Sequence, residues 1–265
     1  TPRWAAWVSA RGGRLWAFDD RERLWNYGDT LARRPEAYHR QLDQAEVGAA
    51  EGRTIHGALR VKEAGLAALA EAIDPHGRDS FVDRWEEGGA THHWADAAFA
   101  VSEGGAAGFT LAVPEGAAPA LAKRYAVGGD GMLEVEYTLS SARARLGMLT
   151  VELNLGLHVP EAPDRFVEVE GERAEPSHFG ARARHAAVAR AAFVDRWADR
   201  RLDLWVDRKA NLDRAPIETV SLSEAGAERV FQGVEVRFGL AVGLEPGKPW
   251  RARFRVAPGR AGSPA

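Results

Sequence analysis

The residues best suited to chemistry gather in the segment GGATHHWAD, Gly88 to Asp96, which places His92 and His93 beside Trp94. An imidazole can transfer a proton or bind a metal near neutral pH, and an indole can stack on the apolar face of a sugar ring. Neighbouring side chains of an extended chain point to opposite sides, which disfavours binding of one metal ion by both histidines. We therefore predict a polar loop, with sugar contact as its functional alternative and no metal site.

Two glutamates are further candidates for contact with a sugar. Glu152 lies in VELNLGL, residues 151 to 157, where apolar residues alternate with Glu152, Asn154 and Gly156. Its polar face lies either in water, the simpler interpretation, or in a cleft. Glu218 lies in IETVSLSEAGAERVFQG, which has no G-x-S-x-G nucleophile motif. Glycosidases need two facing carboxylates, whose separation the sequence does not provide, so neither glutamate is assigned a catalytic role.

Nine tryptophans are many for 265 residues, and they concentrate near the N-terminus. Trp25 and Trp94 are the candidates for sugar stacking, because an indole matches the apolar face of a pyranose. Core packing explains most of the tryptophans equally well.

The stretch DTLARRPEAYHR, Asp29 to Arg40, is unusually rich in charged residues. Glu36 and Arg40 have the i, i+4 spacing of a pair on a solvated helix face. The alternative is anion binding by three basic side chains, Arg33, Arg34 and His39. No glycine-rich loop accompanies them, so we favour a structural role.

Period-two alternation recurs along the chain and predicts an all-β, mainly antiparallel sandwich. The expected strands are Trp4–Val8, Arg14–Phe18, Ala97–Val101, Gly108–Val113, Met132–Leu139, Leu149–His158, Arg165–Val169, Ala187–Asp195, Leu202–Val206, Glu218–Leu222, Val234–Val242 and Trp250–Val256. A helix beginning at Arg34-Pro35-Glu36, with Tyr38, Leu42 and Ala45 on one stripe, and a second over Val61–Ile73 form a short N-terminal insertion. No strong linker divides the chain, so we expect residues 1–265 to form a single domain.

Composition excludes several classes of protein. A formal net charge of -3 argues against a nucleic-acid partner, and the absence of cysteine excludes disulfides and thiolate metal sites. No apolar run reaches the roughly 20 residues needed to span a membrane, so we expect a cytoplasmic protein without cofactors. Three Asn, three Gln and two Met match a thermophilic source, although codon bias in a GC-rich genome explains them equally well.

Several stretches, taken in order, resemble the C-terminal β-sandwich region of glycoside hydrolase family 57 enzymes, which include 4-α-glucanotransferases and α-amylases. The resemblance rests on GGRLWAFDDRERLWNYGDTLARRPEAYHRQL (12–42), TIHGALRVKE (54–63), DSFVDRW (79–85), VELNLGL (151–157) and PIETVSLSEAGAERVFQG (216–233). It implies a galactose mutarotase-like β-supersandwich. It also implies that the catalytic residues belong to an N-terminal barrel that this sequence does not contain.

The resemblance therefore predicts an accessory domain that braces the catalytic barrel of an enzyme acting on α-1,4-glucans and that contacts the glucan. Two alternatives remain open. One is an independent carbohydrate-binding module, in which exposed tryptophans line a groove. The other is a mutarotase-like epimerase, which requires His92, His93 or His158 to face an acid such as Glu152 or Glu218 across a cleft.

Overall fold

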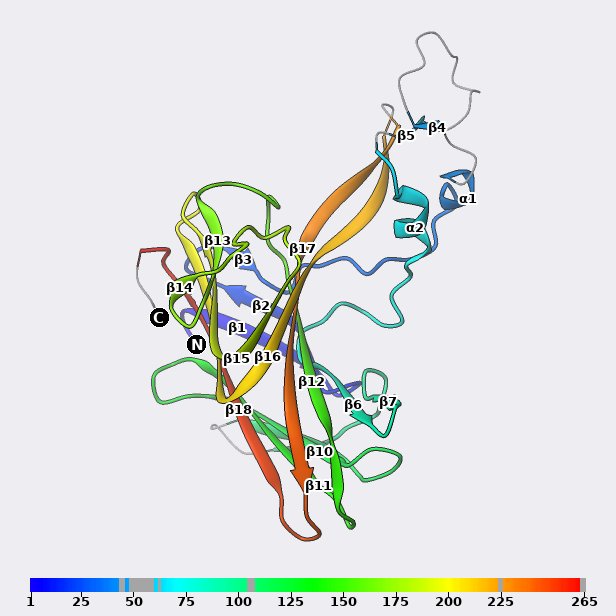
Figure 1. The fold of residues 1–265 in the computed structure, drawn as a ribbon. Helices are drawn as coiled ribbons and strands as arrows, with labels where there is room; N and C mark the ends of the chain where they lie inside the picture. Colours follow the sequence, from blue (N-terminus) through cyan, green and yellow to red (C-terminus); the bar gives the residue numbers. More distant parts are fainter. Residues whose placement is uncertain (43–45, 48–59, 62, 104–107, 224–225, 263–265) are drawn as a thin grey trace.

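The computed structural model describes the chain except residues 43–45, 48–59, 62, 104–107, 224–225 and 263–265 (Figure 1). Strands dominate it, and nearly all of their pairings are antiparallel, so the predicted fold class is confirmed. The strands are β1 Trp4–Ser9, β2 Arg14–Asp20, β3 Trp25–Asn26, β4 Glu46–Val47, β5 Arg60–Val61, β6 Val82–Glu87, β7 Ala90–His93, β8 Ala100–Glu103, β9 Phe109–Val113, β10 Ala120–Val127, β11 Leu133–Ser140, β12 Arg145–Leu155, β13 Arg165–Val169, β14 Glu172–Arg173, β15 Ala183–Asp195, β16 Arg200–Ser223, β17 Gly226–Leu244 and β18 Trp250–Gly259. The helices are α1 His39–Leu42 and α2 Leu66–Glu71.

The main sheet runs in the order β7-β6-β12-β17-β16-β18-β11-β10-β9-β8, and β13, β14 and β15 extend it beside β16. A separate small sheet, β1-β2-β3, lies against it (Figure 1). The two parallel pairings, β4 with β5 and β5 with β17, are confined to the far end of the long β16–β17 hairpin.

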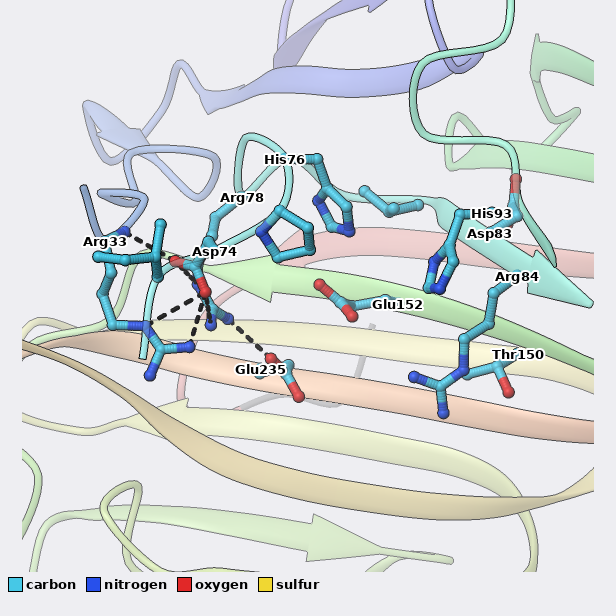
Figure 2. Close-up of a pocket in the computed structure, with 13 residues that line it drawn as sticks. Arg33, Asp74, His76, Arg78, Asp83, Arg84, His93, Thr150, Glu152 and Glu235 are labelled. Carbon is cyan, nitrogen blue, oxygen red and sulfur yellow. Dashed lines mark hydrogen bonds and ion pairs between the residues drawn. The ribbon is translucent and has the colours of Figure 1, made fainter. Parts of the chain in front are cut away.

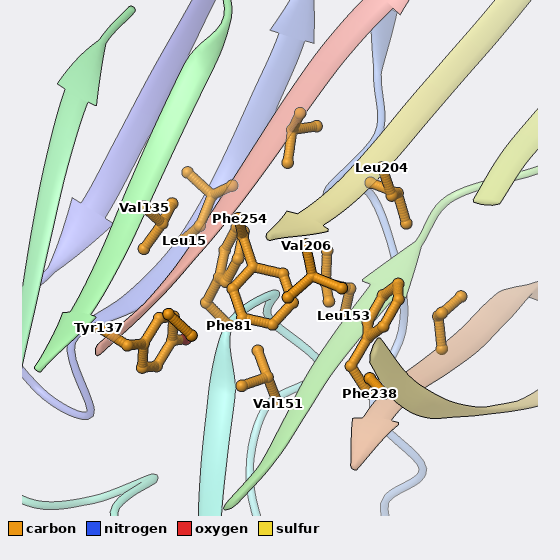
Figure 3. Close-up of a cluster of buried hydrophobic side chains, with 14 of the residues drawn as sticks. Leu15, Phe81, Val135, Tyr137, Val151, Leu153, Leu204, Val206, Phe238 and Phe254 are labelled. Carbon is orange, nitrogen blue, oxygen red and sulfur yellow. The ribbon is translucent and has the colours of Figure 1, made fainter. Parts of the chain in front are cut away.

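The core lies between the curved layers and is built from the inward residues of the alternating strands. Figure 3 shows Phe81, Tyr137, Phe238 and Phe254 meeting at its centre. The ring centroids of Phe81 and Phe254 are 6.0 Å apart, and those of Phe238 and Phe254 are 5.5 Å apart, both at steep angles. Such edge-to-face contacts are a favourable arrangement for aromatic rings in a core.

The helical insertion is shorter than predicted. The backbone from Leu31 to Pro35 is not helical, and α1 begins only at His39. Asp74 Oδ2 accepts a hydrogen bond from the Arg33 amide, which fixes the chain before α1 in a non-helical conformation. His39 Nδ1 accepts a hydrogen bond from the Glu36 amide, a cap just ahead of the helix. Ala45, expected on the same stripe, lies outside the described residues.

The two helices pack on the end of the β16–β17 hairpin rather than on the main core. Leu42, Leu66 and Ala70 form a small apolar cluster there with Val220 and Ala227. The second helix, predicted over Val61–Ile73, is limited to Leu66–Glu71. Gly65, with φ +82°, precedes it in a conformation that glycine adopts readily.

Two further expectations are corrected by the structure. The predicted loop at Gly88–Asp96 is a tight turn at Gly88-Gly89 followed by β7, which pairs with β6. The predicted strands Leu202–Val206 and Glu218–Leu222 belong to one continuous strand, β16, because the whole of residues 200–223 finds partners on β15, β17 and β18.

Candidate functional site

A cleft of about 210 Å³ opens over strands β7, β6, β12 and β17. The loop from Ile73 to Arg78 forms its other wall. Polar and titratable side chains dominate the lining, which includes Arg33, Asp74, His76, Arg78, Arg84, His93, Thr150, Glu152 and Glu235 (Figure 2).

Strand register explains why these side chains share one face. Thr150 on β12 pairs with Arg84 on β6, and Arg84 pairs in turn with His93 on β7. Side chains on one face of a strand recur every second residue, so Glu152 and Asn154 lie on the same side of β12 as Thr150. Asn154 in turn pairs with Glu235 on β17. Figure 2 shows the Glu152 carboxyl below the imidazole of His76, with His93 farther along the sheet.

A cluster of ion pairs closes one end of the cleft. Asp74 Oδ1 accepts hydrogen bonds from Arg33 Nη2 at 2.6 Å and from Arg78 Nη2 at 2.7 Å. Arg78 Nη1 also donates to Glu235 Oε2 at 2.7 Å and to Asn154 Oδ1 at 3.1 Å. Burial opposes the charge of Asp74, but the hydrogen bonds from Arg78 and Arg33 outweigh it and lower the pKa of this carboxyl to about 2. The cluster is therefore a rigid, charged wall.

Glu152 has the opposite electrostatic environment. Burial raises its pKa, and the negative charge of Glu235 adds to the rise, whereas a hydrogen bond from Asn154 Nδ2 to Glu152 Oε1, 2.8 Å long, acts against it. Asn154 is itself fully buried and also donates to the carbonyl of Asp79. The surroundings of Glu152 therefore disfavour its charge.

His93 completes the pair of proton-exchanging groups. Desolvation lowers the pKa of His93, and the charges of Arg84, His76 and His92 lower it further. Its ring centroid lies 6.5 Å from that of His76. Glu152 and His93 both line the cleft, where a carboxyl can donate a proton and a neutral imidazole can accept one.

The remaining sugar-contact candidates lie elsewhere. Trp94 is only 2% exposed, so its ring belongs to the core and has no face open to a ligand. His92 packs edge-on against the Trp94 ring at 5.3 Å. The Trp25 ring is covered by the Arg200 guanidinium at 3.6 Å and contacts His158 at its edge. Glu218 lies on the outer half of β16 and pairs with Arg229, away from the cleft.

Two side chains of the charged stretch 29–40 contact other parts of the chain. Arg33 pairs with Asp74, and the Tyr38 hydroxyl donates to the Val220 carbonyl at 2.8 Å. The stretch also borders a second hollow of about 570 Å³, which shares Arg33 and Arg78 with the cleft. The ion-pair cluster therefore separates two hollows on one face of the molecule.

Six polar residues of the cleft were missed by sequence reasoning: Asp74, His76, Arg78, Arg84, Thr150 and Glu235. The segment DPHGRDS, residues 74–80, carries a turn signal together with four titratable residues, and this combination is a local signal for Asp74, His76 and Arg78. Within the described part of the chain, no group of three or more His, Asp or Glu side chains is arranged to hold a metal ion. In that same part, no helix has the length and apolar character needed to cross a membrane.

The fold is that of the galactose mutarotase-like sandwiches. A galactose mutarotase related enzyme from Lactobacillus acidophilus matches 98% of this chain and 96% of its own with a TM-score of 0.55, at 9% identity. The 4-alpha-glucanotransferase from Thermococcus litoralis matches better, with a TM-score of 0.65 at 18% identity, over 97% of this chain and 36% of that one.

Sequence comparison identifies the family. The model described as "Alpha-amylase/4-alpha-glucanotransferase, C-terminal" matches residues 3–254, and the chain belongs to this family. Alpha-amylase 1 of Dictyoglomus thermophilum is 27% identical in an alignment of 262 positions that covers 92% of this chain. The chain spans about 37% of the length of the curated relatives it matches.

Proposed function

We propose that this chain is the accessory C-terminal domain of an α-glucan-acting enzyme of the glycoside hydrolase family 57 type. Residues 1–265 form one domain, which braces an N-terminal catalytic barrel and acts in the cytoplasm. The family match over residues 3–254, together with coverage of about 37% of the curated relatives, carries this proposal. The larger remainder of those relatives provides the length needed for a catalytic region.

The cleft is the part of the domain best suited to contact glucan. Its volume of about 210 Å³ is below the roughly 300–1,000 Å³ of ordinary small-molecule sites, so it suits one sugar ring at the end of a chain rather than an enclosed oligosaccharide. Glu152, Glu235 and Thr150 supply acceptors for sugar hydroxyls, and Arg84 and His93 supply donors.

Titration calorimetry of the 265-residue chain with maltoheptaose tests the contact. We expect saturable binding that weakens at least tenfold in Thr150→Val and His93→Ala, while Glu218→Gln, placed outside the cleft, binds as the unmodified chain does. Equal affinities in all variants would show that maltoheptaose does not bind in the cleft, and only the bracing role would then remain proposed for this domain.

Bracing is tested on the full polypeptide that contains a catalytic region ahead of residue 3. Removal of residues 3–254 is expected to shorten the half-life of activity at elevated temperature at least tenfold, because the barrel loses a packed neighbour. An unchanged half-life would contradict the bracing role.

A second candidate is sugar epimerisation, and the shared cleft of His93 and Glu152 is the observation that favours it. In this scheme His93 accepts the proton of the anomeric hydroxyl while Glu152 donates its proton to the ring oxygen. The bond between C1 and the ring oxygen breaks, C1 becomes an aldehyde, and rotation followed by the reverse steps gives the other anomer. The mutarotase-related enzyme from Lactobacillus acidophilus shares the fold, but fold alone does not transfer its activity.

Polarimetry of freshly dissolved α-glucose tests the epimerase. A rate above the buffer rate that disappears in both Glu152→Gln and His93→Ala would support it. A rate equal to that of buffer alone would exclude it for glucose.

A further inference from the structure

The nine tryptophans fall into three environments. Trp4, Trp85 and Trp94 are buried, with 5% of the side chain exposed at most. Four others each have an arginine guanidinium over the ring at 3.6 to 5.3 Å: Trp25, Trp197, Trp205 and Trp250, with Arg200, Arg165, Arg190 and Arg208 respectively. Trp7 and Trp16 have neither form of cover.

Trp7 and Trp16 instead contact each other at the surface. Their ring centroids are 6.1 Å apart with planes inclined by 48°, and the two residues are 43% and 52% exposed. In the part of the chain that the structure describes, no Arg or Lys lies over either ring. We name this pair the Trp7–Trp16 patch.

The patch lies at a bulge in the small sheet. Trp7 pairs with Ala17 and Val8 pairs with Leu15, so Trp16 is the extra residue without a partner in the ladder. Leu15 and Ala17, on either side of Trp16, are buried at 3% and 5% exposure, so the alternation of the strand turns the Trp16 ring to solvent. Two neighbouring tryptophans left exposed on one face form an apolar surface of the kind that marks an interaction site.

We propose that the Trp7–Trp16 patch is the docking surface for the catalytic region that precedes this domain in the full polypeptide. This inference rests on the proposed function and specifies which surface makes the contact. The family model describes a C-terminal region and matches from residue 3, so the remaining length of a full relative enters through β1. Trp7 lies three residues after Trp4, the first residue of β1, at a distance of roughly 10 Å along the strand.

The size of the patch favours a tethered partner over a second copy of the chain. Two half-exposed indoles present on the order of 200 Å², whereas a stable dimer buries about 800 Å² on each partner. A covalently joined domain has a high effective concentration, so a small contact centred on two tryptophans is sufficient.

Oxidation by N-bromosuccinimide, followed by peptide mapping, tests the proposal. The full polypeptide is compared with the 265-residue chain, and Trp197, 75% exposed, is the internal control. We expect Trp7 and Trp16 to be oxidised at least tenfold more slowly in the full polypeptide, with the Trp197 rate changed less than twofold. Equal rates for Trp7 and Trp16 in both proteins would overturn the proposal.

Two further arms identify other occupants. Protection of Trp7 and Trp16 from oxidation by maltoheptaose in the 265-residue chain would assign the patch to glucan. Protection that increases with protein concentration would assign it to a second copy of the chain. Either result overturns the proposal.

In calorimetry of the full polypeptide, the double variant Trp7→Ser/Trp16→Ser is expected to separate the unfolding transitions of the two regions, while Trp197→Ser is not. The proposed function fails by a different observation, the absence of a catalytic region from the full polypeptide.

Discussion

Lys123 Nζ lies 2.7 Å from Asp83 Oδ2, and both side chains are completely buried inside the sandwich. Lys123 also donates to the carbonyls of Phe81 and Gly12, and the Tyr137 hydroxyl donates to Asp83 Oδ1. Burial lowers the pKa of Lys123 and raises that of Asp83, which is the expected direction for charges removed from water. The pair ties β6 and β10 to the small sheet through Gly12.

Loss of one member of this pair is expected to be severe. Lys123→Met leaves Asp83 buried with Tyr137 as its one remaining hydrogen-bond donor among those described, and the free energy of unfolding in urea should fall by about 3–5 kcal/mol. Asp83→Leu/Lys123→Met should recover part of the loss, because no uncompensated charge remains. Lys248→Met at an exposed pair serves as control and should leave the midpoint unchanged. A fall below 1 kcal/mol in Lys123→Met would contradict this account.

Gly147 should tolerate no side chain. A Cβ there would lie 2.4 Å from Cζ2 of Trp85 and 2.6 Å from the carbonyl of Glu86. Gly147→Ala should therefore displace the buried indole and lower the unfolding free energy by about 1–3 kcal/mol. Gly243 on the neighbouring strand has open space around its Cβ position, so Gly243→Ala is the matched control. Equal urea midpoints for the two variants would refute the packing of Trp85 over Gly147.

Asp74 should make stability depend on pH in the acid range. Its pKa of about 2 in the folded chain lies below the ordinary value of 3.8, so its stabilisation is present above pH 4 and is lost as pH falls from about 4 to 2. The linked loss is about 2 kcal/mol. Asp74→Asn should remove this part of the acid sensitivity, whereas Asp96→Asn, at an exposed pair with Arg11, should retain it. Urea midpoints measured from pH 2 to 7 decide between these outcomes.

Glu152 should act on stability in the opposite sense. Burial and the charge of Glu235 raise its pKa, so the fold disfavours the charged form relative to the unfolded chain. Its contribution is fully present below the ordinary pKa and is lost as pH rises through the raised value. Glu152→Gln keeps an oxygen for Asn154 and removes the charge, so the melting temperature at pH 8 should rise by about 2–4 °C. No rise, or a fall, would show that the cleft does not disfavour this charge.

Local alternation predicted the strands whose inward residues are all apolar. LEVEYTLS, Leu133–Ser140, is such a strand, with Leu133, Val135, Tyr137 and Leu139 buried. ALAKRYAV, Ala120–Val127, was missed because the buried position between Leu121 and Tyr125 is occupied by Lys123. A charged residue breaks the pattern, and its partner Asp83 is 40 residues away in the sequence.

The cleft was only partly predictable for a similar reason. Glu152 and His93 were recognised from residue type and local pattern. They line the same cleft only because β7, β6, β12 and β17 pair in that order. Glu235 lies in the cleft because β17 pairs with β12, which is about 80 residues earlier in the sequence. The local sequence pattern does not predict the register of that pairing. Trp94 shows the converse: a tryptophan in a polar segment appeared available for stacking, yet the fold places its ring in the core.

Product analysis of the 265-residue chain incubated with maltoheptaose tests the central claim, that this is an accessory domain whose parent enzyme keeps its catalytic residues elsewhere. The account predicts that maltoheptaose is recovered with its chain length unchanged, whether or not it binds. Formation of shorter or longer maltooligosaccharides by the purified chain would contradict the account, because it would require a catalytic site within these residues.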